Sequence, residues 1–225
     1  DAAEVVRRVR DEVMAGKQEG SVDLVWINGE NFRAMKIDKL LYGPFAEYLP
    51  NFKFVQPATQ MDFNEPVDGL ESPWGMAQLT FFGDGAKIST PPQSMDELVA
   101  FAKAHPGRVT YPAPPDFHGT TFVKQALIES IVDQGLLPLP AKDGEFLRAA
   151  APLFDLLDRL HPHLWRAGKQ FPQSQAQLKQ MLADGELLMA LTFNPNEPAN
   201  LVASGELPAT TIAWQHANGT IGNTH

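Results

Sequence analysis

The chain has 225 residues, 44% of them hydrophobic and 20% charged, which is enough to bury the core of one large domain or two small ones. Its 27 acidic and 18 basic residues give a formal charge of −9, which argues against nucleic acid and anionic membranes as partners. The sequence contains no apolar run of about 18 residues that could span a membrane. It also contains no cysteine, which excludes disulfides, thiolate metal sites and cysteine nucleophiles.

The first predicted element is an amphipathic helix that ends at Gly16. Its apolar face is formed by Val5, Val6, Val9 and Val13. A helix with an apolar face at the first residue also predicts further chain before it.

An apolar run over residues 22–26 predicts a buried strand, followed by the polar turn Asn28-Gly29-Glu30 and a second helix. Residues 40–60 are rich in proline and aromatic side chains, and they predict a connection with short elements. A second strand is predicted over residues 76–82, between Pro73 and the Gly83-Asp84 turn.

Two capping boxes predict helix starts, one formed by Ser94 with Glu97 and the other by Ser174 with Gln177. Pro152 either kinks or restarts a third helical pattern that runs over residues 146–160.

Further elements alternate along the chain and predict an α/β fold. They are a strand near residues 108–111, a helix through residues 122–131, a strand over 186–193, a helix over 199–203 and a strand over 211–214. Right-handed crossovers would place the carboxyl ends of these strands on a common edge.

Polar or aromatic turns follow three of the predicted strands, and ligands of open α/β sheets bind at such strand ends. The pattern predicts a ligand cleft lined by Trp26, Asn28, Glu30, Tyr111, Asp116, Thr120, Thr121, Asn194 and Asn196. The alternative for the first turn is that the side chains of Asn28 and Glu30 only form hydrogen bonds with nearby backbone groups.

Gly119, Thr120 and Thr121 open a helix, where free backbone N–H groups and two hydroxyls could accept an anionic or carbonyl group. The alternative is that Asp116 or Thr120 simply caps the helix. Trp26 and Trp74 could stack on a flat or cationic ligand whose charge an acidic side chain neutralises, although a Trp at a strand end more often packs in the core.

Reactive and metal-binding patterns are weak. His161 and His163 would share a face only in an extended segment, and no HExxH spacing accompanies them, so no metal site is predicted. GxSxG, SxxK, P-loop and GxGxxG motifs are absent, and no cofactor or catalytic residue is predicted. His118 beside Asp116 is the best candidate if the chain is an enzyme.

Several phrases along the chain, taken in order, resemble the YnjB-type branch of the bacterial extracellular solute-binding proteins. They are VDLVWINGENF, LLYGPF, SPWGMAQLTF, PGRVTYPAPPDFHGTTFVKQAL, LWRAGKQFP, ADGELLMALTFNP and GTIGNTH. The resemblance implies a periplasmic receptor of the type II bilobal fold that carries a small solute to an ABC permease in the inner membrane. It also implies a signal peptide not present in this chain, and a monomer when full length.

The resemblance implies a partial first lobe over residues 1–75, a hinge strand over 76–82, a second α/β lobe over 83–219 and the start of the return hinge over 220–225. Both ends of the first lobe would lie outside the chain. The expected ligand-binding residues also include Trp74, Phe117, His118, Gly119 and Asn223.

The solute expected from the resemblance is of thiamine, polyamine or another small polar organic type. Aromatic rings with Glu30 and Asp116 resemble the way cationic solutes are held, while the helix start at Gly119 argues equally for a phosphate or carboxylate. A ferric site is disfavoured because Tyr42, Tyr48 and Tyr111 are well separated. A metal-ion receptor and an enzyme of the same fold remain the alternatives.

Overall fold

The computed structural model describes residues 2–63, 65–137, 139 and 142–224. The chain divides into two compact units: the first comprises residues 1–77 and 222–225, and the second comprises residues 78–221. No helix in the described ranges is both long and apolar enough to cross a membrane.

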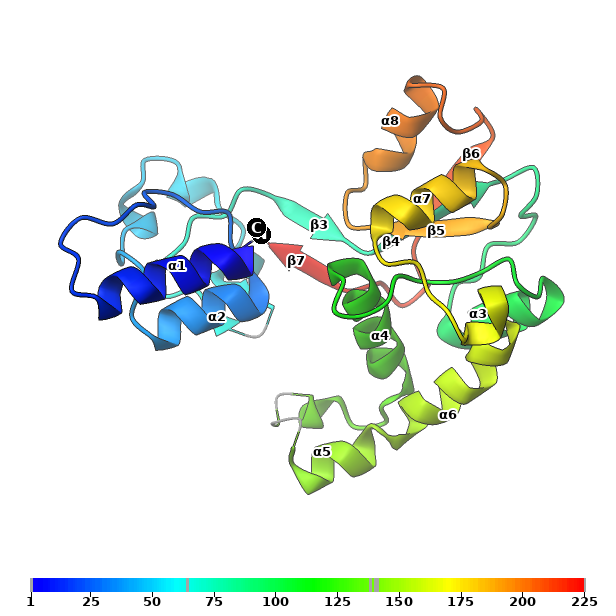
Figure 1. The fold of residues 1–225 in the computed structure, drawn as a ribbon, viewed down its shortest axis with the longest axis horizontal. Helices are drawn as coiled ribbons and strands as arrows, with labels where there is room; N and C mark the ends of the chain where they lie inside the picture. Colours follow the sequence, from blue (N-terminus) through cyan, green and yellow to red (C-terminus); the bar gives the residue numbers. More distant parts are fainter. Residues whose placement is uncertain (1, 64, 138, 140–141, 225) are drawn as a thin grey trace. The chain divides into compact units, whose positions relative to one another are not determined.

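The first unit is built on two helices, α1 (Ala2–Met14) and α2 (Gly29–Ile37), which pack against each other (Figure 1). Val6 of α1 and two side chains of α2, Phe32 and Met35, are buried. Two pairs of short strands accompany these helices. β1 (Met61–Asp62) pairs with β2 (Glu65–Pro66). β3 (Met76–Gln78) pairs with β7 (Gly222–Thr224) where the chain passes between the units.

Short 3₁₀ turns fill the proline-rich connection of the first unit, as predicted. They span Ala46–Tyr48, Phe52–Phe54 and Pro57–Gln60.

The strand predicted over residues 22–26 is wrong. The segment is irregular, and Leu24 within it is 91% exposed. A strand exists only when a neighbour completes its hydrogen-bond ladder, and no described strand pairs with this segment.

The second unit is organised around a three-stranded sheet with β4 (Thr80–Asp84) at its centre. Its neighbours β5 (Met189–Thr192) and β6 (Thr211–Trp214) both run antiparallel to β4. A Cβ on Gly83 would collide with the carbonyl oxygen of Leu188, so the tight pairing of β4 and β5 requires glycine there. The predicted common edge of strand ends therefore holds for β5 and β6 and is wrong for β4, which runs the other way.

Helices pack around this sheet (Figure 1): α7 lies against β5, α8 lies against β6, and α6 packs on α3 and α4. The helices of the second unit are α3 (Met95–Ala104), α4 (Phe117–Ser130), α5 (Gly144–Ala149), α6 (Ala151–Leu160), α7 (Gln175–Ala183) and α8 (Glu197–Ala203). Short 3₁₀ turns span Gln134–Leu136, His161–His163 and Trp165–Gly168.

Both predicted capping boxes begin helices where expected. Ser94 accepts a hydrogen bond from the Glu97 N–H at 3.1 Å, and Ser174 accepts one from the Gln177 N–H at 3.2 Å. Pro152 lies in the first turn of α6, so it restarts the helical pattern and does not kink it.

The strand predicted near residues 108–111 is wrong as an element, although the segment is extended and buried. Its backbone forms isolated hydrogen bonds and no ladder with a described strand: the Leu188 N–H donates to the Arg108 carbonyl and the Trp165 N–H donates to the Val109 carbonyl. The prolines that follow lack N–H groups, so a ladder cannot continue along it.

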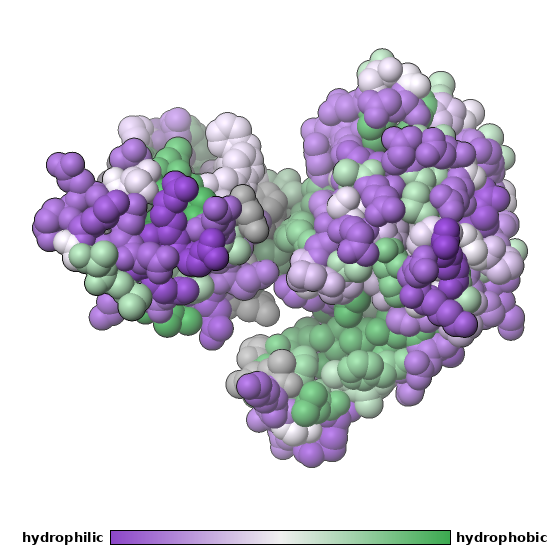
Figure 2. Space-filling model, viewed as in Figure 1, coloured by the Kyte–Doolittle hydropathy of each residue, from purple (hydrophilic) through white to green (hydrophobic). Residues whose placement is uncertain are grey.

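Apolar side chains also remain exposed on the surface of the second unit. Figure 2 shows a green face over the region of α4, α5 and α6, where Val132, Leu147 and Phe154 are exposed. Exposed apolar faces occur where proteins contact other proteins, membranes or ligands.

Candidate functional site

The candidate site of the second unit lies at one edge of its sheet. At this edge β5 and β6 end and β4 begins, because Thr192 pairs with Thr80 and Trp214 pairs with Phe81. The N-terminus of α4 reaches the end of β5 at this edge, where the rings of Phe117 and Phe193 meet edge to face with centroids 5.1 Å apart. Two of the three predicted strand-end loops therefore converge.

Asp116 caps α4 with its carboxylate. Its Oδ1 accepts hydrogen bonds from the N–H groups of His118 at 2.9 Å and Gly119 at 3.1 Å. The alternative reading of this loop, in which Asp116 caps the helix, is thereby confirmed. The expectation that Gly119 offers a free N–H is wrong, because the cap already uses it.

The two threonines of the same turn also use their groups within the helix. The N–H of Thr120 donates to the carbonyl of Asp116 at 2.8 Å, and the hydroxyl of Thr121 donates to the carbonyl of Phe117 at 2.8 Å. Thr121 is buried as well. The first turn of α4 is therefore poorly suited to receive an anion, since the N–H groups of His118, Gly119 and Thr120 are occupied and the Asp116 carboxylate already lies over them.

Gly119 is required by packing. A Cβ at this position would overlap the carbonyl oxygen of Pro112, so only glycine lets the buried extended segment pass against the start of α4. This close approach fixes the position of the first turn of the helix.

Three ionisable side chains lie beside this turn: His118, Lys179 and Glu197. Burial alone would raise the pKa of Glu197, but hydrogen bonds from Lys179 at 2.5 Å, from Thr192 and from Gln175 at 2.9 Å lower it, so the group is a carboxylate. Burial lowers the pKa of His118 and outweighs the opposite effects of Asp116 and Glu197, which leaves the imidazole neutral near pH 7.

The enzyme hypothesis depends on His118 and Asp116. The His118 Nδ1 atom lies 3.8 Å from Asp116 Oδ1, which is too far for a good hydrogen bond. In the described part of the chain no hydroxyl hydrogen-bonds to this imidazole, and the nearby Thr121 hydroxyl already donates to the helix backbone. The geometry provides no activated nucleophile of the usual kind.

The other expected residues of the second unit differ in accessibility. Asn194 and Asn196 are exposed after β5, where Asn194 Oδ1 accepts a hydrogen bond from the Asn196 N–H at 3.1 Å. Tyr111 instead lies in the core, stacked on Phe122 with ring centroids 4.3 Å apart. Burial raises the pKa of Tyr111 to about 12.

The segment that holds His161 and His163 is a 3₁₀ turn, and it is not extended. His161 Nε2 and the Tyr111 hydroxyl are 2.9 Å apart, so the imidazole belongs to the packing around Tyr111. Among the described residues, no three His, Cys, Asp or Glu side chains are grouped so that they could hold a metal ion.

The remaining expected residues lie in the first unit. The rings of Trp26 and Trp74 are 5.6 Å apart and tilted by 55°, and they are 61% and 80% exposed. Asn28 is the N-cap residue of α2, and Glu30 is exposed in its first turn. Asn223 belongs to β7, but its side chain lies outside the described part of the structure.

The sequence reasoning did not identify two acids of the first unit, the buried Asp62 and the half-buried Glu71. Asp62 is fully buried and accepts a hydrogen bond from the Gly29 N–H at the start of α2. Burial raises the pKa of Asp62 to about 6, and burial together with the charge of Asp62 raises the pKa of Glu71 to about 8. No periodicity marks either residue as buried, so only the tertiary structure reveals them.

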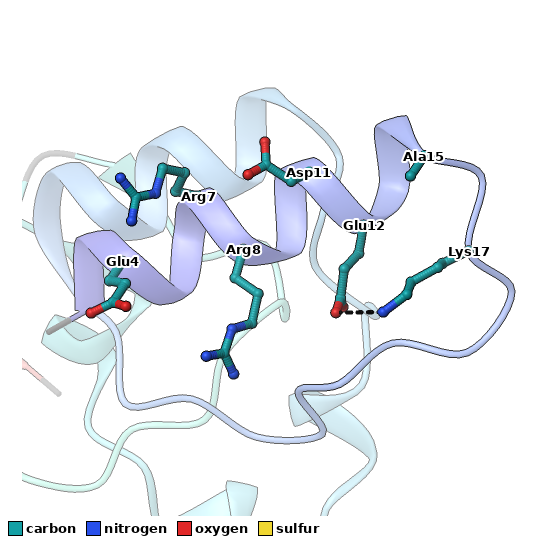
Figure 3. A pocket seen from close by; sticks show the side chains of 7 residues that line it. All are labelled: Glu4, Arg7, Arg8, Asp11, Glu12, Ala15 and Lys17. Carbon is teal, nitrogen blue, oxygen red and sulfur yellow. Dashed lines mark hydrogen bonds and ion pairs between the residues drawn. The ribbon is translucent and has the colours of Figure 1, made fainter.

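A hollow on the outer face of α1 is a weaker candidate (Figure 3). Acidic and basic side chains alternate along it, and Glu12 pairs with Lys17 at 3.0 Å and accepts a hydrogen bond from the Ser21 N–H at 2.9 Å. That backbone hydrogen bond is the main reason why the pKa of Glu12 falls to about 2. The lining residues are Glu4, Arg7, Arg8, Asp11, Glu12, Ala15 and Lys17, with no aromatic ring among them.

Comparison with known proteins places the chain in a family. The profile of the family described as bacterial extracellular solute-binding protein matches residues 1–221. The chain belongs to this family. Protein YnjB of Escherichia coli (strain K12) is 48% identical over 228 residues, which cover 100% of this chain and 59% of YnjB.

Solved structures of two other proteins show the same fold. An ABC transporter protein from Clostridium perfringens matches with a TM-score of 0.67 and 13% identity over 100% of this chain and 61% of its own. The periplasmic binding protein AfuA from Actinobacillus pleuropneumoniae, with fructose-6-phosphate bound, matches with a TM-score of 0.58 and 16% identity over 99% and 61%. The chain therefore has the type II periplasmic-binding-protein fold, and it spans about three fifths of the length of these relatives.

Proposed function

We propose that the intact protein is the periplasmic substrate-binding component of an ABC importer, which binds a small solute and delivers it to a permease in the inner membrane. Membership of the extracellular solute-binding family supports this role. The observation that carries it is the convergence of the α4 N-terminus and the loop after β5 at one sheet edge. Ligands of open α/β sheets bind at such an edge.

The same proposal covers the organisation of the protein. Residues 1–75 would contribute to one lobe and residues 83–219 would form the other, with residues 76–82 and 220–225 acting as the hinge. The receptor would be a secreted monomer, exported by a signal peptide. Export is tested by osmotic shock of cells that express the intact gene, and the monomer is tested by light scattering.

The solute that this geometry favours is an organic cation of the thiamine or polyamine type, or another small polar organic molecule without an oxyanion. The Asp116 carboxylate occupies two donors of the α4 N-terminus, which disfavours a phosphate or carboxylate there. Phe117 beside it is 39% exposed and offers an aromatic face for a cation. The exposed pair Trp26 and Trp74 offers further aromatic surface in the first unit.

A thermal-shift screen of the intact protein tests this proposal with thiamine, spermidine, amino acids, sugars, fructose 6-phosphate, inorganic phosphate and divalent metals. A solute at 100 times its Kd stabilises the native state by about 2.7 kcal/mol. We expect a cationic organic solute to raise the Tm and the two phosphates to leave it unchanged. Stabilisation by a phosphate alone would refute the cationic class, and stabilisation by a metal alone would favour a metal receptor of this fold.

Asp116→Asn separates recognition from folding, because asparagine also caps helices but carries no charge. We expect this variant to keep its Tm and to bind the cationic solute at least tenfold more weakly. Asp143 caps α5 in the same way, with hydrogen bonds from the Glu145 N–H at 2.7 Å and the Phe146 N–H at 3.4 Å, so Asp143→Asn is the matched control. Equal affinity of the two variants would contradict the role of Asp116.

An enzyme of the same fold is the second candidate, favoured only by the proximity of His118 and Asp116. His118→Gln should leave solute affinity within about threefold if the protein is a receptor. Turnover of the bound solute by the wild type, abolished in His118→Gln, would establish the enzyme instead.

A further inference from the structure

Helix α4 holds the segment through which the chain leaves the second unit. Gln125, on α4, is 2% exposed and uses both ends of its side-chain amide. Its Oε1 accepts a hydrogen bond from the Ile221 N–H at 2.7 Å, and its Nε2 donates to Glu129 Oε1 at 2.7 Å and to the carbonyl of Gly219 at 3.4 Å. A buried amide with these partners fixes the position of residues 219–221 on the helix.

Glu129, one turn further along α4, extends the same network. Its Oε1 lies 2.5 Å from His216 Nδ1, and its Oε2 accepts a hydrogen bond from the Met95 N–H at 2.7 Å. Burial alone would raise the pKa of Glu129, but hydrogen bonds from His216, Gln125 and Met95 lower it. The ring of His216 also stacks on Phe81 of the central strand, with centroids 4.8 Å apart.

The two passages of the chain near the unit boundary are in turn joined to each other. The Leu79 N–H donates to the carbonyl of Ile221 at 2.9 Å, and the Thr220 hydroxyl donates to the carbonyl of Leu79 at 2.5 Å. Gln78 Nε2 donates to the carbonyl of Thr220 at 3.2 Å. Residues 78–79 and 219–221 therefore form one hydrogen-bonded group, which we call the crossing, and it is fixed to α4 through Gln125.

The opposite end of α4 carries Asp116 and Phe117, the residues of the candidate site. The helix runs without interruption from Phe117 to Ser130, so its first turn and the two anchoring side chains belong to one rigid element. A displacement of the first turn must therefore move the crossing, or break the hydrogen bonds of Gln125.

We propose that α4 couples occupancy of the sheet-edge site to the geometry of the crossing, and that Gln125 is the positioning residue which transmits this coupling. The proposal rests on the proposed function for the identity of the solute, but the coupling between the two ends of α4 is a property of the chain itself. It assigns a role in solute-dependent movement to a glutamine that touches no solute.

Hydrogen exchange tests the coupling without any solute. Asp116→Ala removes the cap of α4, and we expect it to speed amide exchange in the crossing by about fivefold while peptides of β5 exchange as before. Asp143→Ala, which removes the cap of α5, should leave the crossing unchanged, and Asp116→Asn should restore the wild-type rate. An unchanged crossing in Asp116→Ala, or equal acceleration in β5, would overturn the coupling.

A second arm uses the cationic solute that stabilises the protein in the thermal-shift screen. Its binding should slow exchange in the crossing about tenfold in the wild type. Gln125→Met removes the polar contacts at similar volume, so it should still bind the solute but lose most of this slowing. Ser130→Ala, which removes a hydrogen bond internal to α4, should keep it.

The cap variants and the solute experiment distinguish failure of the coupling from failure of the proposed function. Slowing in Gln125→Met as large as in the wild type would refute the role of Gln125. If no compound in the screen stabilises the protein, the proposed function fails, and the coupling is still decided by the cap variants.

Discussion

The stability of the first unit should fall as the pH rises, because two buried carboxyl groups lie beside the start of α2. Glu71 Oε2 and Asp62 Oδ1 are both buried, and neither has a hydrogen-bond partner among the described residues. Burial, with the charge of Asp62, raises the pKa of Glu71 from its ordinary value of 4.5 to about 8. The folded state therefore holds the proton of Glu71 more tightly than the unfolded state does.

The sign and size of the effect follow from this difference. The contribution to stability is complete below about pH 4.5 and is lost as the pH rises toward 8. The full difference in pKa corresponds to about 5 kcal/mol. Because Glu71 is only partly buried and its titration is coupled to Asp62, we expect about half of that, ~2 kcal/mol.

Replacement of Glu71 by glutamine keeps the shape of the side chain and removes its titration. We expect Glu71→Gln to change the free energy of unfolding of the first unit little at pH 5 and to raise it by ~2 kcal/mol at pH 8. Urea titrations at several pH values measure this, followed by tryptophan fluorescence in a background that carries Trp165→Phe and Trp214→Phe, so that only Trp26 and Trp74 of the first unit report.

Glu47, which is exposed in the same unit, provides the control Glu47→Gln. This variant should follow the wild type at every pH. If Glu71→Gln also runs parallel to the wild type between pH 5 and pH 8, the burial argument for the two carboxyl groups is wrong.

Three further predictions concern the second unit. Gly119→Ala should lower the free energy of unfolding by at least ~3 kcal/mol in urea titrations, because the new Cβ would overlap the Pro112 carbonyl oxygen. Gly144→Ala, in the first turn of α5, is the control. Among the described residues its Cβ would meet Arg148 Nη1 at 3.6 Å, so this variant should be neutral or slightly stabilising. Ser94→Ala should cost about 1 kcal/mol through loss of the α3 cap, measured in the same way, and a loss below 0.3 kcal/mol would contradict the capping role. Tyr111→Phe should leave solute affinity unchanged in calorimetry, since this ring lies in the core, and a tenfold loss would return it to the site.

Local signals predicted much of the second unit. The capping boxes at Ser94 and Ser174 located two helix starts, because a cap depends on residues only three positions apart. The apolar run over residues 186–193 contains β5, which is buried along its whole length. Elements defined by neighbours in sequence were therefore accessible to sequence reasoning.

The wrong sequence predictions have a different cause, which is that they depend on partners far away in the sequence. Residues 22–26 carry the composition of a strand, yet a strand needs a partner that composition does not specify. The direction of β4 could not be read either, since alternating helices and strands suggested parallel neighbours, whereas β4 is antiparallel to both. Among site residues, the loop from Asp116 to Thr121 stays a prediction, and which of its donors are free depends on the geometry of the cap.

Helix α4 is held by three different kinds of contact. At its start, Gly119 lies against the Pro112 carbonyl and Asp116 closes the first turn, while Gln125 and Glu129 bind backbone N–H groups of two other segments near its end. The contacts with Pro112, Ile221 and Met95 join α4 to three other segments, so the helix cannot rotate about its axis without breaking at least one of them. A solute that pulls on the first turn must consequently move α4 as a whole, and the hydrogen bonds of Gln125 give that movement its route to the crossing.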